Sequence, residues 1–263
     1  MTLKIFTVDA FTDRNFAGNP AAVCLLNEDI DDALMKNIAA EMNLSETAFV
    51  KKENGEYSLR WFTPKVEVQL CGHATLATAH ILWEEGLLSK DDDAKFNTLS
   101  GQLIVKNIDG EYEMNFPASE VTDSEYDAEL VNALGVEPVS FAVTEHSYIA
   151  ELANDDAVFS ASPDFNALSK LEKFGTIITS KSSDERFDFI SRYFVPAKGI
   201  NEDPVTGSAH CALGPYWSQK TGEKSFSAYQ ASLRGGSMKI KLDGDRIFLT
   251  GKAVTFLKGE IVF

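Results

Sequence analysis

Glu46 lies in the segment NLSETAFV, residues 43–50, whose other residues are typical of a half-buried strand. In a strand that alternates its faces, Glu46 shares one side with Leu44 and Ala48. A carboxyl group among apolar neighbours loses hydration, so we expect its protonated form to be favoured and its pKa to rise. Such a group can give and take protons near neutral pH, as a general acid/base must. The alternative is a solvated glutamate at a strand end, in a segment that simply ends the preceding helix.

Two further groups of reactive residue types lie at the predicted starts of two helices, in the segments CGHATLATAHILWEEG and NEDPVTGSAH. They are Cys71, Gly72 and His73 in the first, and Asp203, Thr206, Gly207, Ser208 and His210 in the second. The first turn of a helix has unpaired N–H groups and a partial positive charge, which suits a carboxylate or a developing enolate. Capping is the alternative for any single residue. The matched pair favours two helix starts that bind one small acid from both sides.

The residues before these helices repeat a pattern. Residues 60–64, RWFTP, match residues 192–196, RYFVP, and each run ends a strand-like segment because proline lacks a ladder donor. A loop and a glycine-led, small-residue helix follow in both places, which favours duplication over coincidence. We therefore expect two similar lobes, 1–117 and 118–263, joined where MNFPASEVTDSE leaves a strand through a Pro- and Ser/Asp-rich link. The last strand is a candidate to return to the first lobe.

Strand-like runs dominate the rest of the chain, and DG or GD signals at residues 109–110 and 243–245 predict hairpins. Helices are predicted over residues 31–42, 128–135 and 165–174. The two glycine-led helices are rich in Ala, Gly and Thr, which suits a helix wrapped by a curved sheet. The fold class expected is therefore α+β, with antiparallel or mixed sheets.

Composition excludes several classes of protein. The net charge is −16, whereas phosphate binding needs clustered Lys and Arg, so we expect no nucleic-acid partner. The amino-terminal run is interrupted by Asp9 and followed by polar residues, so no signal peptide or membrane span is expected. Three cysteines, without a CxxC pair, favour reduced thiols in a cytoplasmic protein.

Four long motifs resemble one known family. They are FTVDAFTDRNFAGNPAAV, NLSETAFV, RWFTPKVEVQLCGHATLATAHIL and NEDPVTGSAHCALGPYW. Nearly end to end, the sequence resembles the PhzF-type phenazine biosynthesis proteins, which share the diaminopimelate epimerase fold. The resemblance implies two lobes, each a curved, mostly antiparallel sheet around a central helix, with the active site in the cleft between them. It also implies a homodimer and isomerase chemistry without a cofactor or metal.

The resemblance also implies roles for single residues. Glu46 looks like the family's catalytic acid/base, and His73 and Asp203 look like residues that orient the substrate or assist proton movement. The substrate-binding residues implied, including contacts to a substrate carboxylate, are Asn19, Cys71, Gly72, Gly207 and Ser208.

Related epimerases use two thiols on opposite faces of the substrate carbon. Here Cys71 aligns with one of them, Asp203 stands at the second position, and Cys211 lies a turn or more inside its helix. The hypothesis is therefore an isomerase that resembles the phenazine-pathway dihydro-hydroxyanthranilate isomerase. Glu46 would move a proton between two carbons of a small carboxylate-bearing metabolite.

The alternatives are an epimerase or racemase, and a small-molecule binding protein of the same fold without turnover. Metal-assisted hydrolysis is disfavoured because His73 and His80 are an i, i+7 pair with no visible third ligand. A serine hydrolase is disfavoured because Ser208 lies in TGSAH and not in a G-x-S-x-G elbow.

Overall fold

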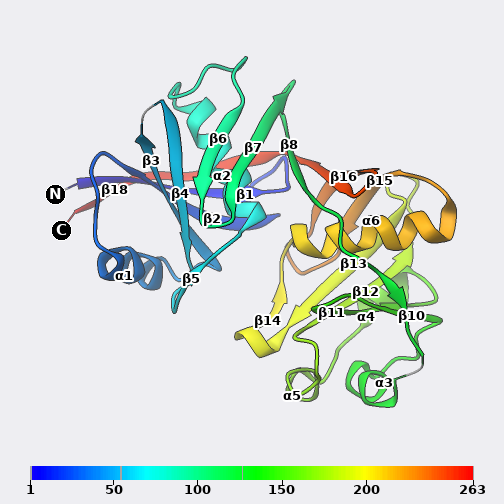
Figure 1. Ribbon diagram of the computed structural model, residues 1–263. Helices are drawn as coiled ribbons and strands as arrows, with labels where there is room; N and C mark the ends of the chain where they lie inside the picture. The colour runs from blue at the N-terminus through cyan, green and yellow to red at the C-terminus, as the bar shows by residue number, and fades with distance from the viewer. Residues whose placement is uncertain (1, 54, 126, 263) are drawn as a thin grey trace. The chain divides into compact units, whose positions relative to one another are not determined.

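The computed structural model describes residues 2–53, 55–125 and 127–262. The chain divides into two compact units: unit 1 comprises residues 1–115 and 250–263, and unit 2 comprises residues 116–249. The fold is α+β, with many strands and few helices (Figure 1).

Unit 1 is built on strands β1 to β8 and on β18 from the end of the chain. The strands are β1 (Thr2–Ala10), β2 (Asn19–Leu26), β3 (Glu46–Glu53), β4 (Glu56–Phe62), β5 (Glu67–Val68), β6 (Ala94–Thr98), β7 (Gly101–Ile108), β8 (Glu111–Pro117) and β18 (Ala253–Val262). Most neighbours pair antiparallel, whereas β2 with β3 and β4 with β6 pair parallel. Each parallel pair requires a crossover, and a helix provides it.

Helix α2 (Gly72–Glu84) is the centre of unit 1. Almost all of its residues are buried, and it contacts β1, β2, β3, β7 and β18. Its alanines and threonines allow this close approach, and Thr75 and Thr78 satisfy their hydroxyls on helix carbonyls. Helix α1 (Asp32–Met42) packs elsewhere, against Phe49 and Phe62 on the opposite side of the strands.

Unit 2 contains strands β9 to β17 and helices α3 to α6. The strands are β9 (Thr122–Asp123), β10 (Ser140–Val143), β11 (Ser147–Glu151), β12 (Gly175–Lys181), β13 (Phe189–Val195), β14 (Ile200–Asp203), β15 (Ser225–Gln230), β16 (Gly236–Asp243) and β17 (Arg246–Gly251). The helices are α3 (Ala128–Leu134), α4 (Asp155–Ser160), α5 (Phe165–Leu168) and α6 (Gly207–Thr221). Figure 1 shows α6 on one side of these strands and α3 and α5 on the other, where Leu130 and Leu168 join Phe194 in a core.

The topology repeats between the units. In unit 2 the pairs β11–β12 and β13–β15 are parallel, and β12–β13, β13–β14 and β15–β16 are antiparallel. In unit 1 the same relations hold for β2–β3, β4–β6, β3–β4, β4–β5 and β6–β7. The match of RWFTP with RYFVP therefore extends to the strand order of two similar lobes.

The predicted elements are mostly present, with one clear exception. Asp109 and Gly110 join β7 to β8, both with positive φ as a two-residue type I′ turn requires. The helix predicted over residues 165–174 is wrong beyond its first turn, because α5 ends at Leu168. The N–H groups of Lys170 and Leu171 bond three residues back, in a tight turn that returns the chain to β12.

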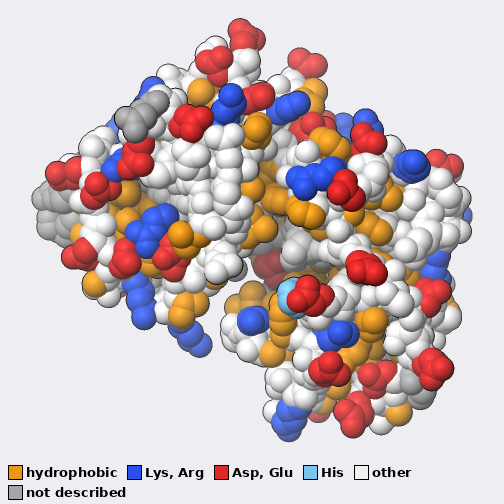
Figure 2. All heavy atoms as spheres, in the orientation of Figure 1, with side chains coloured by type: hydrophobic (Ala, Val, Ile, Leu, Met, Phe, Trp, Pro, Cys, Tyr) orange, Lys and Arg blue, Asp and Glu red, His pale blue; other side chains and the backbone are white. Residues whose placement is uncertain are grey.

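The surface contains no obvious basic stripe on the face in Figure 2, where acidic and basic side chains are interspersed. Among the described residues, no helix is long and apolar enough to cross a membrane.

Candidate active site

Glu46 is the first residue of β3 and lies beside the start of α2. The chain reaches it from α1 through Asn43, whose left-handed backbone conformation ends that helix. Ala48, two residues on, is fully buried, whereas Phe49 packs on the opposite side against α1. The alternation expected from NLSETAFV is therefore present. The Glu46 side chain retains 19% of its exposure, and its Oε2 lies 3.3 Å from Nε2 of His73.

His73 is a buried, neutral imidazole. Burial lowers its pKa to about 4, so it carries no charge at neutral pH. Its Nδ1 lies 3.3 Å from Nδ2 of Asn19, and an amide nitrogen can only donate. Nδ1 is then the acceptor, and the ring proton on Nε2 is directed at the Glu46 carboxylate. Asn19, which is fully buried on β2, therefore orients the group that contacts Glu46.

Cys71 completes this cluster. It is the N-cap of α2, but its side chain makes no capping hydrogen bond. Its Sγ lies instead 3.6 Å from Nδ1 and 4.0 Å from Nε2 of His73. A carboxylate oxygen of Glu46, the sulfur of Cys71 and a ring nitrogen of His73 lie within 4.8 Å of one another. Among the described residues, no other three His, Cys, Asp or Glu side chains come this close together. Gly72 follows at the first helical position, where its N–H and the next amides are free of intrahelical bonds.

The start of α6 in unit 2 is fixed by a different network. Thr206 is the N-cap. Its hydroxyl donates to the carboxylate of Asp203 and accepts no hydrogen bond from a helix N–H. Gln230 accepts from the Thr206 N–H at 2.8 Å and donates to the Asp203 carbonyl at 2.7 Å. Gln230 is 1% exposed, so its amide is a buried clamp on the loop from Asp203 to Thr206. No sequence motif pointed to Gln230.

His210, one turn inside α6, supports the fold. It is fully buried, its Nδ1–H donates to the Thr206 carbonyl at 2.7 Å, and its ring stacks on Phe189. Burial lowers its pKa to about 4. Cys211 is buried beside it, and desolvation raises the pKa of that thiol to about 12. Neither group is suited to exchange protons with a ligand at neutral pH.

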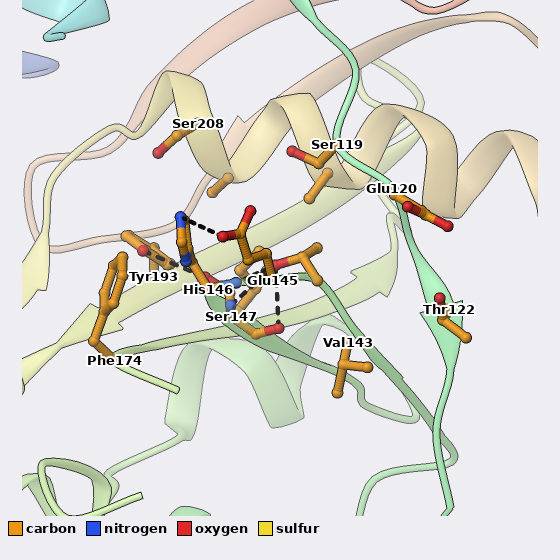
Figure 3. A pocket seen from close by; sticks show the side chains of 14 residues that line it. Ser119, Glu120, Thr122, Val143, Glu145, His146, Ser147, Phe174, Tyr193 and Ser208 are labelled. Atoms are coloured by element: carbon orange, nitrogen blue, oxygen red, sulfur yellow. Dashed lines mark hydrogen bonds and ion pairs between the residues drawn. The ribbon is translucent and has the colours of Figure 1, made fainter. Parts of the chain in front are cut away.

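Gly207 and Ser208 form the first turn of α6, and Ser208 is exposed. Ser208 also borders a cavity of 660 Å³ within unit 2 (Figure 3). The lining residues are Ser119, Glu120, Thr122, Val143, Thr144, Glu145, His146, Ser147, Phe174, Ile177, Tyr193, Ser208, Ala209 and Ala212. This volume is within the range of small-molecule sites, which is about 300–1,000 Å³.

The cavity has a polar floor and an aromatic wall. The hydroxyls of Ser147 and Tyr193 are 3.4 Å apart, and the His146 ring stacks on Phe174 with centroids separated by 5.3 Å. Figure 3 shows the His146 and Phe174 side chains below Ser208, in the same part of the view. Sequence reasoning found Ser208 but missed the other lining residues. Ala209 and Ala212 lie on α6 with Ser208, and most of the rest come from separate turns and strands.

Both arginines of the duplicated pattern support the strands that lead to the helix starts. Arg60 donates two hydrogen bonds to Glu67, at 2.7 and 2.8 Å, and Arg192 donates two to Glu202, at 2.7 and 2.9 Å. Each guanidinium also lies over the second aromatic residue of its own motif. Glu67 follows Arg60 by 7 positions, whereas Glu202 follows Arg192 by 10. Because the spacings differ, comparing the two segments did not reveal these acids.

A model of the PhzC-PhzF family, described as phenazine biosynthesis-like protein, matches residues 8–259. The chain belongs to this family. It is 49% identical over 263 residues to a protein of Halalkalibacterium halodurans named uncharacterized isomerase, with 100% of this chain and 99% of that protein covered. The resemblance seen in the four motifs is therefore confirmed.

Solved structures agree with this assignment. A PhzF family protein of Enterococcus faecalis is 40% identical, with a TM-score of 0.96 and 100% of both chains covered. A predicted epimerase of Pseudomonas aeruginosa is 18% identical, with a TM-score of 0.73 and 99% of both chains covered, and it shares the fold. The chain thus has relatives named isomerases and shares its fold with a predicted epimerase.

Proposed function

We propose that this member of the PhzC-PhzF family is an isomerase that moves a proton between two carbons of a small carboxylate-bearing metabolite. Glu46 is the acid/base, and the reaction uses no cofactor. The observation that carries the proposal is the contact between Glu46 and the neutral His73, beside the start of α2.

In the proposed reaction, the Glu46 carboxylate removes a proton from one carbon of a conjugated system. The electron pair moves through that system toward the substrate carboxylate, and the same Glu46, now protonated, returns the proton to another carbon. His73 takes up no second proton at neutral pH because its pKa is about 4. It keeps its own Nε2 proton because the N–H of a neutral imidazole is a very weak acid. Its role is to hold one carboxylate oxygen, which leaves the other for the proton.

We assign the starts of α2 and α6 to stabilising the negative charge of the substrate. Peptide N–H groups at Gly72 and at Gly207 and Ser208 suit a carboxylate or the charge that develops when the proton leaves. Asp203 is held by Thr206 and Gln230, so its carboxylate has a fixed direction. We assign Asp203 to orienting the substrate or assisting proton movement.

Epimerisation by two thiols is less well supported. Cys71 lies in the Glu46 cluster, but Asp203 stands at the position of the second thiol, and Cys211 is a buried thiol whose pKa is about 12. A single carboxylate that removes and returns one proton agrees better with these residues.

Proton exchange in deuterated water tests the proposal. Small unsaturated and hydroxylated carboxylic acids are incubated with the protein, and deuterium incorporation at carbon is followed by NMR. We expect incorporation by the native protein, and a rate lower by about 10²–10⁴-fold in Glu46→Gln, because this change keeps size but removes the titrating group.

Glu53→Gln is the matched control. It lies at the far end of the same strand, is exposed, and should exchange at the native rate. Exchange by Glu46→Gln at the native rate would show that the acid/base is another residue. Tight binding of acids without any exchange would identify a binding protein.

A further inference from the structure

Strand β18 has one edge that faces solvent. Its other edge pairs with β1 from Ala253 to Val262, and Figure 1 shows the two strands side by side near the ends of the chain. The residues from Phe256 to Glu260 are all exposed. Gly259 is among them and has no side chain, so its exposed atoms belong to the backbone. Backbone donors and acceptors on such an edge can pair with a further strand.

Apolar side chains are exposed along the same strand. Phe256 is 49% exposed, and its ring contacts the ring of Phe16, with centroids 5.4 Å apart. Phe16 and Val262 are 73% and 78% exposed, and Leu257 is also exposed. Large apolar residues that gather on a long exposed edge mark a surface for contact with another protein chain.

Antiparallel pairing of β18 with the β18 of a second copy has one register that matches the charges. Directly opposite residues share a face, with Cβ atoms about 4.5–5.5 Å apart. When Gly259 lies on the two-fold axis, Lys258 lies opposite Glu260 of the second copy, and symmetry repeats this pair. Moving the axis by one residue places Lys258 opposite Lys258, or Glu260 opposite Glu260.

The same register pairs the apolar residues with one another. Phe256 lies opposite Val262 of the second copy, and Leu257 lies opposite Ile261. Three of these four side chains are exposed in the single chain, and Ile261 is half-buried. The strand therefore offers its own copy apolar contacts on both sides of a central group of charges.

The charges around this central group agree with the register. Within one chain, Lys4 on β1 lies opposite Glu260. The signs therefore alternate from Lys4 to Glu260 to Lys258 of the second copy. Lys258 also contacts Glu84 and Glu85, at 3.3 and 2.9 Å, and its ammonium group has three donors, so it can bind a further carboxylate.

We propose that β18 is the surface through which two copies of this chain form a dimer, by antiparallel pairing around Gly259. The pairing satisfies the backbone groups of both edges and covers the apolar side chains. It is closed, because the contact uses the free edge of each copy. The family resemblance implies a homodimer, and the exposed edge supplies its surface and its register. The inference does not depend on the proposed function.

Charge reversal tests the pairing. Light scattering should give twice the chain mass for the native protein. Glu260→Lys places lysines opposite each other and Lys258→Glu places glutamates opposite each other, so in each variant the dimer Kd should rise about tenfold or more. Mixed in equal amounts, the two variants should form a heterodimer, because every opposed pair then has opposite signs. Lys95→Glu, which changes an exposed lysine on β6, is the matched control and should remain a dimer.

Gly259→Cys tests the register. Its two thiols lie opposite each other across the axis, at a separation that a disulfide spans, so mild oxidation should join two chains. The native cysteines, Cys24, Cys71 and Cys211, are buried, so the native protein should not cross-link. Lys95→Cys carries an exposed thiol away from β18 and should not cross-link either.

Two results would overturn the proposal. One is a native protein that has the mass of a single chain at every concentration tested. The other is a dimer that Gly259→Cys does not cross-link and that Glu260→Lys does not weaken, because such a dimer uses another surface. If circular dichroism shows that the charge variants fold poorly, the presence or absence of the cross-link decides.

Discussion

The two units share their strand order but differ at the position of Glu46. In β3, Phe49 pairs with Arg60, and Glu46 is three residues earlier; in β12, Ile178 pairs with Arg192, and the residue three earlier is Gly175. A duplicated framework therefore carries an acid in one copy and no side chain in the other.

The surroundings of Gly175 explain this difference. A Cβ built there would lie 2.5 Å from the Tyr193 hydroxyl and would also overlap Ser147. Those two hydroxyls form the floor of the cavity beside Ser208. Unit 1 thus has a carboxylate beside its central helix, and unit 2 has a cavity and polar hydroxyls. This asymmetry favours one acid/base over a symmetric pair.

The starts of α2 and α6 also differ in the residues that surround them. At α2, His73 contacts the carboxylate of Glu46 on β3, and the N-cap Cys71 contacts His73. At α6, the N-cap Thr206 bonds an acid three residues away, Asp203, and a buried amide clamps both. The start of α2 is arranged around a carboxylate, a thiol and an imidazole, and the start of α6 around a hydrogen-bonded loop.

The buried histidines of the two central helices allow the sharpest comparison of stability. His73 and His210 both have a pKa of about 4, below the unfolded value of about 6.5, so the unfolded chain binds more protons between these values. The stability from each neutral histidine is therefore complete above pH 6.5 and is lost as the pH falls toward 4. Linkage gives a loss of about 2 kcal/mol per histidine between pH 7 and pH 5.

Urea unfolding of His73→Gln and His210→Asn at these two pH values measures the effect. Each variant should lose about 2 kcal/mol less than the native protein over this range. Only His73→Gln should also change exchange activity at pH 7. Equal loss in both variants and the native protein would show that the histidines are not buried neutral groups.

The two arginine pairs predict unequal costs for the same substitution. Arg192 and Glu202 are 12% and 19% exposed, and Arg192 also donates to the Ala161 carbonyl at the end of α4. Arg60 and Glu67 are 32% and 25% exposed. We expect Arg192→Gln to lower the free energy of unfolding by about 3 kcal/mol, and Arg60→Gln by about 1 kcal/mol. Denaturant titration decides this, and the reverse order would contradict the account of how the two copies are supported.

Gly175→Ala tests whether unit 2 has space for a side chain at Gly175, the counterpart of Glu46. Overpacking should cost about 1–3 kcal/mol in unfolding free energy, because both contacting hydroxyls are buried. Gly207→Ala is the matched control, since its Cβ would meet Leu249 at an ordinary 3.5 Å, and its stability should be nearly unchanged. Equal stability of the two variants would remove the steric explanation for Gly175.

The sequence predicted much of this framework, for physical reasons. Alternating runs and glycine-led helices identify most strands and both central helices, because burial and backbone freedom are encoded locally. The shared RWFTP and RYFVP pattern revealed the duplication. Alternation within NLSETAFV placed Glu46 on the side of Ala48, where it meets His73.

Contacts between distant segments were not predictable. Gln230 reaches Thr206 from a strand that follows α6, and Arg192 reaches Glu202 across a β-bulge that changes the spacing. The proximity of Asn19 to His73 depends on how β2 lies against α2. Such contacts depend on tertiary packing, and no single segment contains a pattern for them.

The path of one hydrogen shows whether a single carboxylate both removes and returns the proton. A substrate found by the exchange screen is labelled with deuterium at the carbon that loses its proton, and converted in ordinary water. Because one partly buried carboxylate removes and returns the proton, we predict that part of the product carries deuterium at the accepting carbon. A product without any deuterium, formed while the remaining substrate keeps its full label, would show that a second group supplies the proton and would contradict the account.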